Sequence, residues 1–231
     1  MDQAVITGRG LSRNFQMGET VVTAVRDCDI EIMPGMMTTI LGKSGSGKST
    51  LCNLLSGLDR PTLGTVTLLG RDLSKLSDSE MAALRAQSLG FVLQKDNLVP
   101  FLTLEENVAA PLLFAGLTRR SAQRRALEML EMTGIGHRAK SWPAQVSGGE
   151  AQRAAVARAC AGRPAVVFAD EPTGALDRRN GETVGSLLKD LCHETGTAVV
   201  VVTHDAELAS KSDRTFHMED GRLLDSPRED R

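Results

Sequence analysis

An uninterrupted stretch from Thr38 to Ser49, TTILGKSGSGKS, decides the fold. Its first part, Thr38–Leu41, is typical of a buried strand. Its second part, Gly42–Ser49, fits the pattern GxxxxGK[ST] at every position. Glycines in such a loop let backbone N–H groups turn inward around phosphate oxygens. Apolar residues then recur at helical spacing from Ser49 to about Gly57, so the loop leads into a helix whose positive end would face a bound anion.

The side chains of the loop favour a nucleotide as the ligand. Lys48 can reach the β- and γ-phosphates, and the Ser49 hydroxyl can ligate Mg²⁺. The alternative, a flexible glycine turn, is disfavoured because the pattern lies between a strand and a helix. The loop residues predicted to contact the nucleotide are Gly42, Lys43, Ser44, Gly45, Ser46, Gly47, Lys48, Ser49 and Thr50.

A second motif, AVVFADE at Ala165–Glu171, joins an apolar run to two carboxylates. A buried strand can deliver Asp170 to the Mg²⁺ shell while Glu171 faces an attacking water. Glu171 is then the natural general base, a role that typically contributes about 10²–10⁴ in rate. A solvated strand end is the alternative when the motif is taken alone. Paired with the phosphate loop, the motif predicts an ATPase or a GTPase.

The composition excludes several classes of protein. The 231 residues include 24 % charged and 41 % hydrophobic residues and no tyrosine, which excludes a disordered or collagen-like chain. A formal net charge of −2 argues against a dedicated nucleic-acid binder, so no nucleic-acid partner is predicted. The longest β-rich run, Thr197–Thr203, is far shorter than the roughly 18 apolar residues of a membrane span, and no signal-peptide pattern is present. The expectation is a soluble protein of the cytoplasm.

The four cysteines, Cys28, Cys52, Cys160 and Cys192, form no CxxC pair. We expect reduced thiols in small apolar positions. The adjacent residues Cys192 and His193 leave a zinc site as the alternative, although adjacent ligands without a second pair do not match structural zinc spacing.

Strands alternate with helices along the chain, which predicts an α/β protein. The apolar runs at Ala165–Ala169 and Ala198–Val202 predict strands covered on both faces of a parallel sheet, with a helix at Gly181–His193 between them. A helical pattern extends from Leu104 to about Thr133, with a loop at Gly116–Thr118, and Pro111 is expected to interrupt it. Further strands are predicted at Val21–Val25, Cys28–Met33 and Leu89–Leu93, a turn and strand at Pro61–Gly70, and a helix at Asp78–Gln87.

A third motif, VSGGE at Val146–Glu150, is followed by the sequence AQR. A serine hydroxyl and glycine N–H groups at a helix start form another anion site, although SGG alone also fits an ordinary helix cap. In order with DEPT at Asp170–Thr173 and ALD at Ala175–Asp177, the motif resembles the signature of the ATP-binding cassette (ABC) family, usually written LSGGQ. The resemblance covers nearly the whole chain, roughly Ile6 to Leu224.

The resemblance implies roles for further residues. Gln94 matches the family's Q-loop glutamine, which contacts Mg²⁺ or water, and His204 matches the switch histidine that contacts the γ-phosphate. Asp177 matches the D-loop aspartate, which acts across a dimer interface, and Phe15 stands where the family has an aromatic ring that stacks on adenine. The implied cofactors are ATP and Mg²⁺. The implied catalytic residues are Lys48, Gln94, Glu171 and His204, the metal ligands are Ser49, Gln94 and Asp170, and the further nucleotide contacts are Ser147, Gly148, Gly149, Glu150 and Asp177.

The implied fold is a P-loop NTPase (RecA-like) parallel-sheet core with an N-terminal antiparallel β subdomain and an α-helical signature subdomain. Residues 1–231 are expected to form one nucleotide-binding domain, with the helical subdomain at roughly 95–160 inserted in the core. Two such cassettes are expected to close as a homodimer, with each ATP held between one phosphate loop and the partner's signature. A separate transmembrane permease is implied, which places the chain on the cytoplasmic side of the cell membrane.

One stretch narrows the resemblance to a branch of the family. Between Gln94 and Leu112, members of the branch usually read QxFNL[LI]P, then T, then ENVxxPL, and this chain reads QKDNLVP, LT, EENV and PL. The branch contains lipoprotein-releasing (LolD-like), macrolide-efflux (MacB-like) and cell-division (FtsE-like) ATPases. It implies a MacB/FtsX-like permease and export or extrusion of an amphiphile such as a drug, peptide, lipoprotein or haem.

Other functions remain as alternatives. Within the same branch, an FtsE-like ATPase would drive a membrane partner that regulates cell-wall enzymes rather than a transporter. An ATPase that acts on ribosomes or DNA would need tandem cassettes or a long coiled-coil insertion, and a GTPase would need an NKxD-type motif. The sequence contains none of these three features.

The sequence departs from the family pattern at three places, the second of them the signature, and it also carries one run of arginines. Asp96 replaces a usual aromatic in the region expected to meet the permease, which bears on the partner and not on the ATPase. Val146 and Glu150 replace the leucine and glutamine of the signature, and Phe15 replaces a tyrosine while retaining the stacking ring. The run Arg119–Arg125 is expected to form a solvated helix face, and contact with anionic lipids or an acidic permease loop is the alternative.

Overall fold

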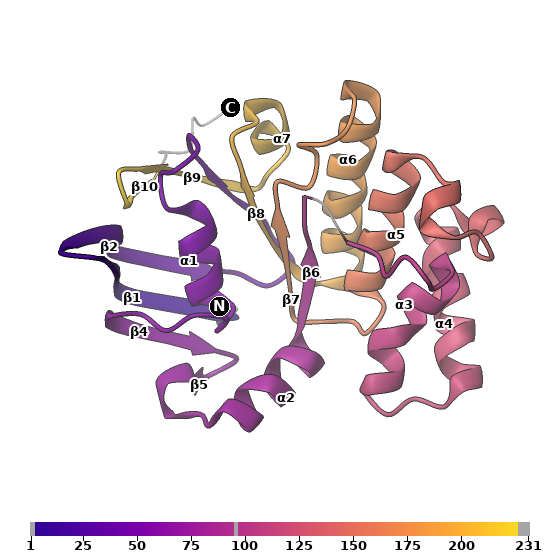
Figure 1. Cartoon of the computed structure of the whole chain (residues 1–231), viewed down its shortest axis with the longest axis horizontal. Coiled ribbons are helices and arrows are strands. Elements are labelled where there is room, and N and C mark those ends of the chain that lie inside the picture. The colour runs from indigo at the N-terminus through magenta and orange to yellow at the C-terminus, as the bar shows by residue number, and fades with distance from the viewer. Residues whose placement is uncertain (1–2, 95–96, 226–231) are drawn as a thin grey trace.

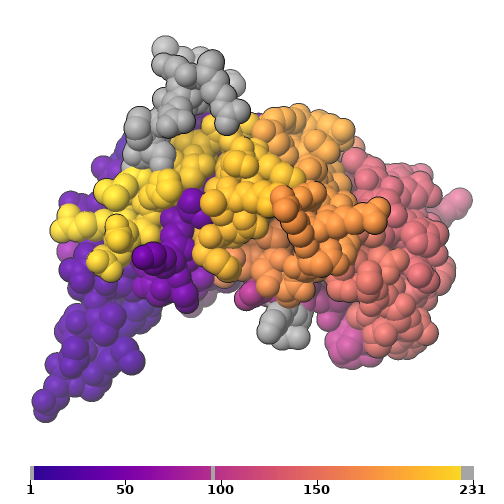
Figure 2. Space-filling model, turned by 90° about the horizontal axis from the view of Figure 1, so that it is seen from above, coloured from indigo at the N-terminus to yellow at the C-terminus, as the bar shows by residue number. Residues whose placement is uncertain are grey.

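Helix α1 (Lys48–Leu55) lies between two β-sheets, and a cluster of helices lies beside the larger sheet on its other side (Figure 1). The computed structural model describes residues 3–94 and 97–225, so Asp96 lies outside the described residues. Figure 2 shows the indigo N-terminal strands projecting from the rest of the molecule. The predicted α/β fold, with a parallel sheet and an antiparallel β subdomain, is confirmed.

The N-terminal sheet is antiparallel, with the strand order β2-β1-β4-β5. The two short strands predicted at Val21–Val25 and Cys28–Met33 are one strand. A β-bulge in β2 lies opposite Leu11–Arg13, and Asp27 within the bulge has a φ of 46°. The bulge accommodates the break in the alternating pattern, so the strand continues past it. The strands are β1 (Ile6–Met17), β2 (Thr20–Ile32), β4 (Leu63–Leu68) and β5 (Arg71–Asp72).

The larger sheet has the order β10-β9-β3-β8-β7-β6, and its strands are parallel except for β10 at the edge. The strands are β3 (Met37–Leu41), β6 (Leu89–Val92), β7 (Val166–Asp170), β8 (Ala198–Thr203), β9 (Arg214–Glu219) and β10 (Arg222–Asp225). The sequence prediction missed β9 and β10. In β9 only Phe216 and Met218 alternate with exposed residues, which is too short a pattern to stand out.

Helices fill the connections between these strands. Pro111 does not interrupt its helix. Removing one backbone donor is tolerated there because Leu104, Val108 and Leu112 of the same helix are buried in the helical core. The remaining helices and helical turns are η1 (Leu73–Lys75), α2 (Asp78–Ser88), α3 (Leu104–Phe114), α4 (Arg119–Met132), η2 (Gly136–Arg138), η3 (Pro143–Gln145), α5 (Gly148–Cys160), α6 (Arg178–Thr195) and α7 (Ala206–Ser210).

The central strands are apolar on both faces, as predicted from their valine runs. In β8, Val199 and Val201 join the core cluster shared with α5 and α6, whereas Val200 and Val202 join the cluster around α1. Successive side chains of a strand point to opposite faces, so a strand covered on both sides needs an apolar residue at each position.

The parallel arrangement brings the carboxyl ends of the five parallel strands to one edge. Leu41 of β3 pairs with Thr203 of β8, and Asp170 of β7 pairs with Val202. Ligands of open α/β sheets bind outside this edge. Within residues 3–94 and 97–225, no helix has the length and hydropathy needed to cross a membrane.

Candidate functional site

The phosphate loop lies between β3 and α1, as predicted, and its shape requires its glycines. Gly45 and Gly47 have φ values of 80° and 104°, in the left-handed region that favours glycine. A Cβ on Gly47 would come within 2.2 Å of the Ala24 carbonyl oxygen, and a Cβ on Gly42 within 2.3 Å of the Met218 carbonyl oxygen. The loop therefore packs against β2 and β9 at distances that only glycine permits.

Three features of the loop suit an anion such as a phosphate. Helix α1 begins at Lys48 with no side-chain cap, so the N–H groups of its first turn remain available to a ligand. Ser46 Oγ is buried and has no hydrogen-bond partner among the described residues. Lys48 is only 7 % exposed, and its Nζ donates to the Lys43 carbonyl oxygen at 2.9 Å. A cation, an unpartnered hydroxyl and a helix N-terminus thus share one loop.

Oxygen ligands for a divalent cation lie next to the loop. Ser49 Oγ is 3.4 Å from Asp170 Oδ1, and the Gln94 side chain lines the same cleft. Burial raises the pKa of the Asp170 carboxyl, an effect that the Ser49 hydrogen bond partly offsets and that nearby Glu171 reinforces. A hydroxyl, a carboxylate and an amide oxygen are hard ligands of the kind that Mg²⁺ prefers, so these residues fit the ion.

Glu171 is held in a strained and specific position. Its φ of 44° lies in the left-handed region, and its N–H donates to the Val202 carbonyl oxygen at 2.8 Å. One carboxylate oxygen is 2.8 Å from His204 Nδ1, and the other accepts a hydrogen bond of 2.9 Å from Thr203 Oγ1. The end of β8 therefore fixes the direction of a carboxylate that directly follows β7.

These residues line one cleft of about 430 Å³ at the carboxyl edge of the larger sheet. The cleft brings together residues of the phosphate loop, the Q-loop glutamine, the two carboxylates and the predicted switch histidine. Its lining consists of Ala24, Ser44, Gly45, Gly47, Lys48, Ser49, Thr50, Gln94, Asp170, Glu171 and His204.

The signature motif lies elsewhere and is a helix N-terminus. Ser147 caps α5: its Oγ accepts from the Glu150 N–H at 3.2 Å, while the Glu150 carboxylate accepts from the Ser147 N–H at 2.9 Å. Among the described residues, those that line the cleft do not include Ser147–Glu150. In one chain, the signature surface at Ser147–Glu150 therefore lies apart from the cleft.

The start of α6 packs against the signature. A Cβ on Gly149 would come within 2.3 Å of Asn180 Oδ1. Asp177 caps α6 by accepting from the Asn180 N–H and from Asn180 Nδ2, each at 2.8 Å, and these bonds lower the pKa of the Asp177 carboxyl. Asp177 thus belongs with the signature surface and not with the cleft.

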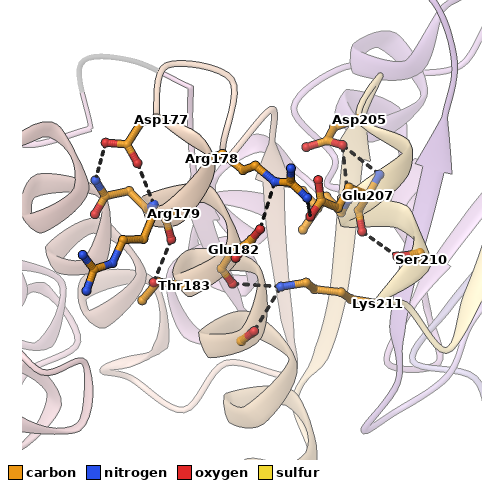
Figure 3. A network of polar contacts seen from close by, with 12 residues as sticks. Asp177, Arg178, Arg179, Glu182, Thr183, Asp205, Glu207, Ser210 and Lys211 are labelled. Atoms are coloured by element: carbon orange, nitrogen blue, oxygen red, sulfur yellow. Dashed lines mark hydrogen bonds and ion pairs between the residues drawn. The ribbon is translucent and has the colours of Figure 1, made fainter.

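A polar network ties the start of α6 to α7, which follows directly after β8 (Figure 3). Arg178 Nε is 3.1 Å from Glu182, and Arg178 Nη2 is 3.3 Å from Glu207. The neighbouring Lys211 donates to the Glu182 carbonyl oxygen at 2.9 Å. All these ion-paired side chains are exposed, so the network contributes little to the stability of the fold.

Phe15 lies on β1 and pairs with Val22 of β2, two positions from Ala24 in the cleft. The Arg13 guanidinium lies 4.6 Å from the centre of the Phe15 ring. The cation therefore covers one face of the ring, and Phe15 is not among the described residues that line the cleft.

The capping carboxylate of the signature predicts a pH dependence. Hydrogen bonds from Ser147, and then Arg138, lower the pKa of Glu150 from 4.5 to about 2. The depressed pKa stabilises the folded chain at pH values above 4.5, and this contribution is lost as the pH falls from 4.5 towards 2. We expect Glu150→Gln to show a smaller fall in melting temperature between pH 7 and pH 3, measured by scanning calorimetry. Glu131→Gln, on the exposed face of α4, is the control, and equal falls in all three proteins would contradict the assignment.

The structure bears on both the predicted reduced cysteines and the zinc alternative at Cys192 and His193. All four cysteines are free and buried. Ligand atoms of Cys192, His193 and Asp213 lie within 4.8 Å of one another. Asp213 is nevertheless already engaged, by His193 at 3.1 Å, Lys189 at 3.7 Å and the Met37 N–H at 2.8 Å. Burial raises the pKa of the Cys192 thiol to about 11, which disfavours the thiolate that would bind a metal. These residues therefore form an ion-pair cluster beside a buried thiol.

The arginine run lies on α4, mostly on its exposed face. Arg124 and Arg125 approach Glu128 at 4.0 and 3.3 Å, and Arg125 also donates to the Ala161 carbonyl oxygen at 3.2 Å. The predicted solvated helix face describes it well.

Several residues that shape the site were not predicted. Ala24 lines the cleft from β2, and Thr203 orients Glu171. The only sequence signal for Thr203 was its place between an apolar strand and His204. Asn180 gave no signal, because its contact with Gly149 joins positions 31 residues apart.

Comparison with known proteins identifies relatives over nearly the whole chain. A family model described as ABC transporter matches residues 25–174. The chain is 43 % identical over 223 residues to the lipoprotein-releasing system ATP-binding protein LolD of Shewanella oneidensis, covering 96 % of this chain and 97 % of that protein. It is 44 % identical over 224 residues to the macrolide export ATP-binding/permease protein MacB of Rhodopseudomonas palustris, covering 97 % of this chain but only 34 % of that longer protein.

Solved structures agree. A dimeric post-hydrolysis state of the ATP-binding cassette MJ0796, bound to ADP and Pi, matches with a TM-score of 0.87 and 39 % identity over 94 % of this chain and 96 % of that one. The protein cbiO1 of Clostridium perfringens, part of the ABC transporter complex cbiONQ, matches with a TM-score of 0.86 and 26 % identity over 96 % of this chain and 88 % of that one.

Proposed function

The chain belongs to the ABC transporter family, and on that premise we propose that it hydrolyses Mg²⁺-ATP to drive export or extrusion of an amphiphile through a separate permease. The relatives make it an ATP-binding subunit of the LolD and MacB type. The observation that carries the proposal is the cleft in which Lys48, Asp170 and Glu171 converge around the phosphate loop. The names of the two relatives, a lipoprotein-releasing and a macrolide-export protein, support an amphiphilic cargo such as a drug, peptide, lipoprotein or haem.

In this proposal the loop binds the nucleotide and the neighbouring oxygens bind the metal. Backbone N–H groups of the loop Gly42–Thr50 hold the phosphates together with the Lys48 ammonium, except those of Gly42 and Ser46, which donate to the Thr203 and Lys43 carbonyl oxygens. Phe15 stacks on adenine. Ser49, Asp170 and Gln94 would hold Mg²⁺, which supplies neutralisation of the charge on the phosphate oxygens. Because the loop is already formed, its donors are in place before the charge develops.

Glu171 is the general base in this proposal. Its carboxylate accepts the proton of the attacking water, and His204 contacts the γ-phosphate from the next strand. Thr203 and His204 hold the carboxylate at hydrogen-bonding distance, which fixes its direction across the cleft.

Hydrolysis in this proposal requires a homodimer. The surface formed by Ser147, Gly148, Gly149, Glu150 and Asp177 contributes nothing to the cleft of its own chain, so it is available to the nucleotide of a second copy. The dimeric MJ0796 cassette supports this arrangement.

In this proposal the chain forms one domain of 231 residues and lies on the cytoplasmic side of the membrane. The permease would dock against its helical subdomain, which we place at residues 95–160. A groove of about 350 Å³ runs between α3, α5 and β6, lined among others by Pro111, Ala115 and Arg158. Phe114 lies between two of these positions and is 88 % exposed. An exposed aromatic beside an open groove supports contact with a MacB/FtsX-like permease.

Purified protein tests the ATPase directly. We expect phosphate release from ATP that stops with EDTA, returns with Mg²⁺ and is lost in Lys48→Ala, which removes the cation of the loop. Malachite-green detection of phosphate measures it. Lys75→Ala, an exposed lysine remote from the cleft, is the control, and metal-independent hydrolysis would contradict the proposal.

The identity of the membrane partner distinguishes a role in transport from a role in cell-wall regulation. Capture of the chain from cross-linked membranes, followed by mass spectrometry, identifies the co-purifying permease. Reconstitution of the pair in vesicles then shows whether an amphiphile stimulates hydrolysis. Stimulation by a cell-wall enzyme, and not by an amphiphile, would favour the FtsE-like alternative.

A further inference from the structure

Two buried amide side chains, Asn97 and Gln152, join the signature helix to the segments on either side of the cleft. Asn97 follows the Q-loop and is 9 % exposed, and Gln152 lies on α5 and is 6 % exposed. Asn97 Nδ2 donates to Gln152 Oε1 at 3.0 Å. Both belong to the small set of buried polar residues, for which each hydrogen bond matters because no water replaces it.

Asn97 is hydrogen-bonded to the backbone of Leu93, four positions earlier. Its Oδ1 accepts from the Leu93 N–H at 2.7 Å, and its Nδ2 donates to the Leu93 carbonyl oxygen. Leu93 immediately precedes Gln94, whose side chain lines the cleft. A single amide thus pairs with both backbone groups of Leu93, the residue that leads into Gln94.

Gln152 makes two further bonds, and each ends beside a predicted site residue. Its Nε2 donates to the Leu93 carbonyl oxygen at 3.0 Å and to the Pro172 carbonyl oxygen at 2.9 Å. Leu93 precedes Gln94, and Pro172 follows Glu171. One side chain on the signature helix therefore holds the backbone next to the metal-facing glutamine and next to the strained glutamate.

Resting on the proposed function, we propose that Gln152 is a positioning residue: it fixes Gln94 and Glu171 relative to the helix that begins with the signature. Pro172 is the first residue after the left-handed φ of Glu171, a conformation that persists only where neighbouring contacts hold it. A movement of α5 is passed through the same amide to both residues. The signature of one chain and the general base of that chain are thereby linked.

The test is the kinetics of ATP hydrolysis in Gln152→Ala. A catalytic group displaced by about 1 Å can lose roughly 10²-fold in rate, so we expect kcat to fall by about 10–100-fold. The KM for ATP is expected to stay near its unmodified value, because the phosphate loop is untouched. Gln152→Glu is the second variant: it keeps the volume but replaces the donor with a carboxylate facing two carbonyl oxygens, and the same split is expected.

Asn107→Ala is the matched control. Asn107 is 1 % exposed on α3, and its amide also holds a loop, accepting from the Val99 N–H at 2.7 Å and donating to the Leu102 and Thr103 carbonyl oxygens at 3.0 Å. It touches neither Leu93 nor Pro172 in any described contact. We expect its melting temperature to fall as in Gln152→Ala while kcat, measured well below both melting temperatures, is retained.

Two outcomes overturn the inference. If the unmodified protein hydrolyses ATP and kcat is unchanged in both Gln152 variants, the inference about Gln152 is overturned while the proposed function stands. An equal loss of kcat in Asn107→Ala would show that Gln152 acts through stability only. Unmodified protein that hydrolyses no ATP would instead overturn the proposed function on which the inference rests.

Discussion

Glu171→Gln is expected to bind ATP normally and to lower turnover by about 10²–10⁴-fold, the usual contribution of a general base. The amide keeps the shape of the side chain and still accepts from Thr203 Oγ1, which is 2.9 Å away. It cannot accept the proton of the attacking water. With hydrolysis blocked, the γ-phosphate that joins two chains is retained, so the variant should accumulate as an ATP-bound dimer. Single-turnover phosphate release and size-exclusion chromatography with ATP measure the two effects.

Glu194→Gln, an exposed carboxylate near the end of α6, is the control for this substitution. It should retain turnover and should stay monomeric at the same ATP concentration. If Glu171→Gln hydrolysed ATP at the rate of the unmodified protein, Glu171 would not be the general base. A loss of ATP affinity in the variant would instead show that Glu171 acts mainly in nucleotide binding. We do not expect this result, because the carboxylate lies across the cleft from the phosphate loop.

The parts of the site that could be predicted are those whose physical cause is local in sequence. The loop at Gly42–Ser49 needs its glycines for positive φ and close packing, and those requirements are visible as residue types. The cap at Ser147 is visible as well, because serine followed three positions later by Glu150 is the spacing of a capping box. Valine runs likewise predicted the strands covered on both faces.

The rest depends on contacts between distant positions. Gln152 lies 59 positions from Leu93 and 20 from Pro172, and no residue pattern announces that its amide will reach both. The position of Glu171 depends on its hydrogen bonds to Val202 and Thr203 of β8, and no local pattern in the sequence announces them or its φ of 44°. Pro111 shows the same limit from the opposite side, because tertiary burial of α3 outweighs the local cost of a proline.

Ser147→Arg is expected to spare ATP binding to one chain and to abolish dimer closure. The structure separates the two surfaces: Ser147 caps α5, whereas the cleft is lined by the phosphate loop and the ends of β6, β7 and β8. An arginine fills the space that a partner's phosphate would enter. Hydrolysis should therefore fall by on the order of 10²-fold or more, since correct placement across the interface is lost.

The same substitution also removes a helix cap, at a cost of about 0.5–2 kcal/mol, and this cost must be distinguished from the loss of closure. Ser77→Arg provides the comparison, because Ser77 and Glu80 form the same capping box at the start of α2, with the Glu80 carboxylate accepting from the Ser77 N–H at 2.9 Å. Both variants should lose similar melting temperature, but only Ser147→Arg should lose hydrolysis and ATP-dependent dimerisation in the Glu171→Gln background. Normal hydrolysis by Ser147→Arg would refute the role of the signature across the dimer. Equal loss in both variants would assign the effect to the cap rather than to the nucleotide of the second chain.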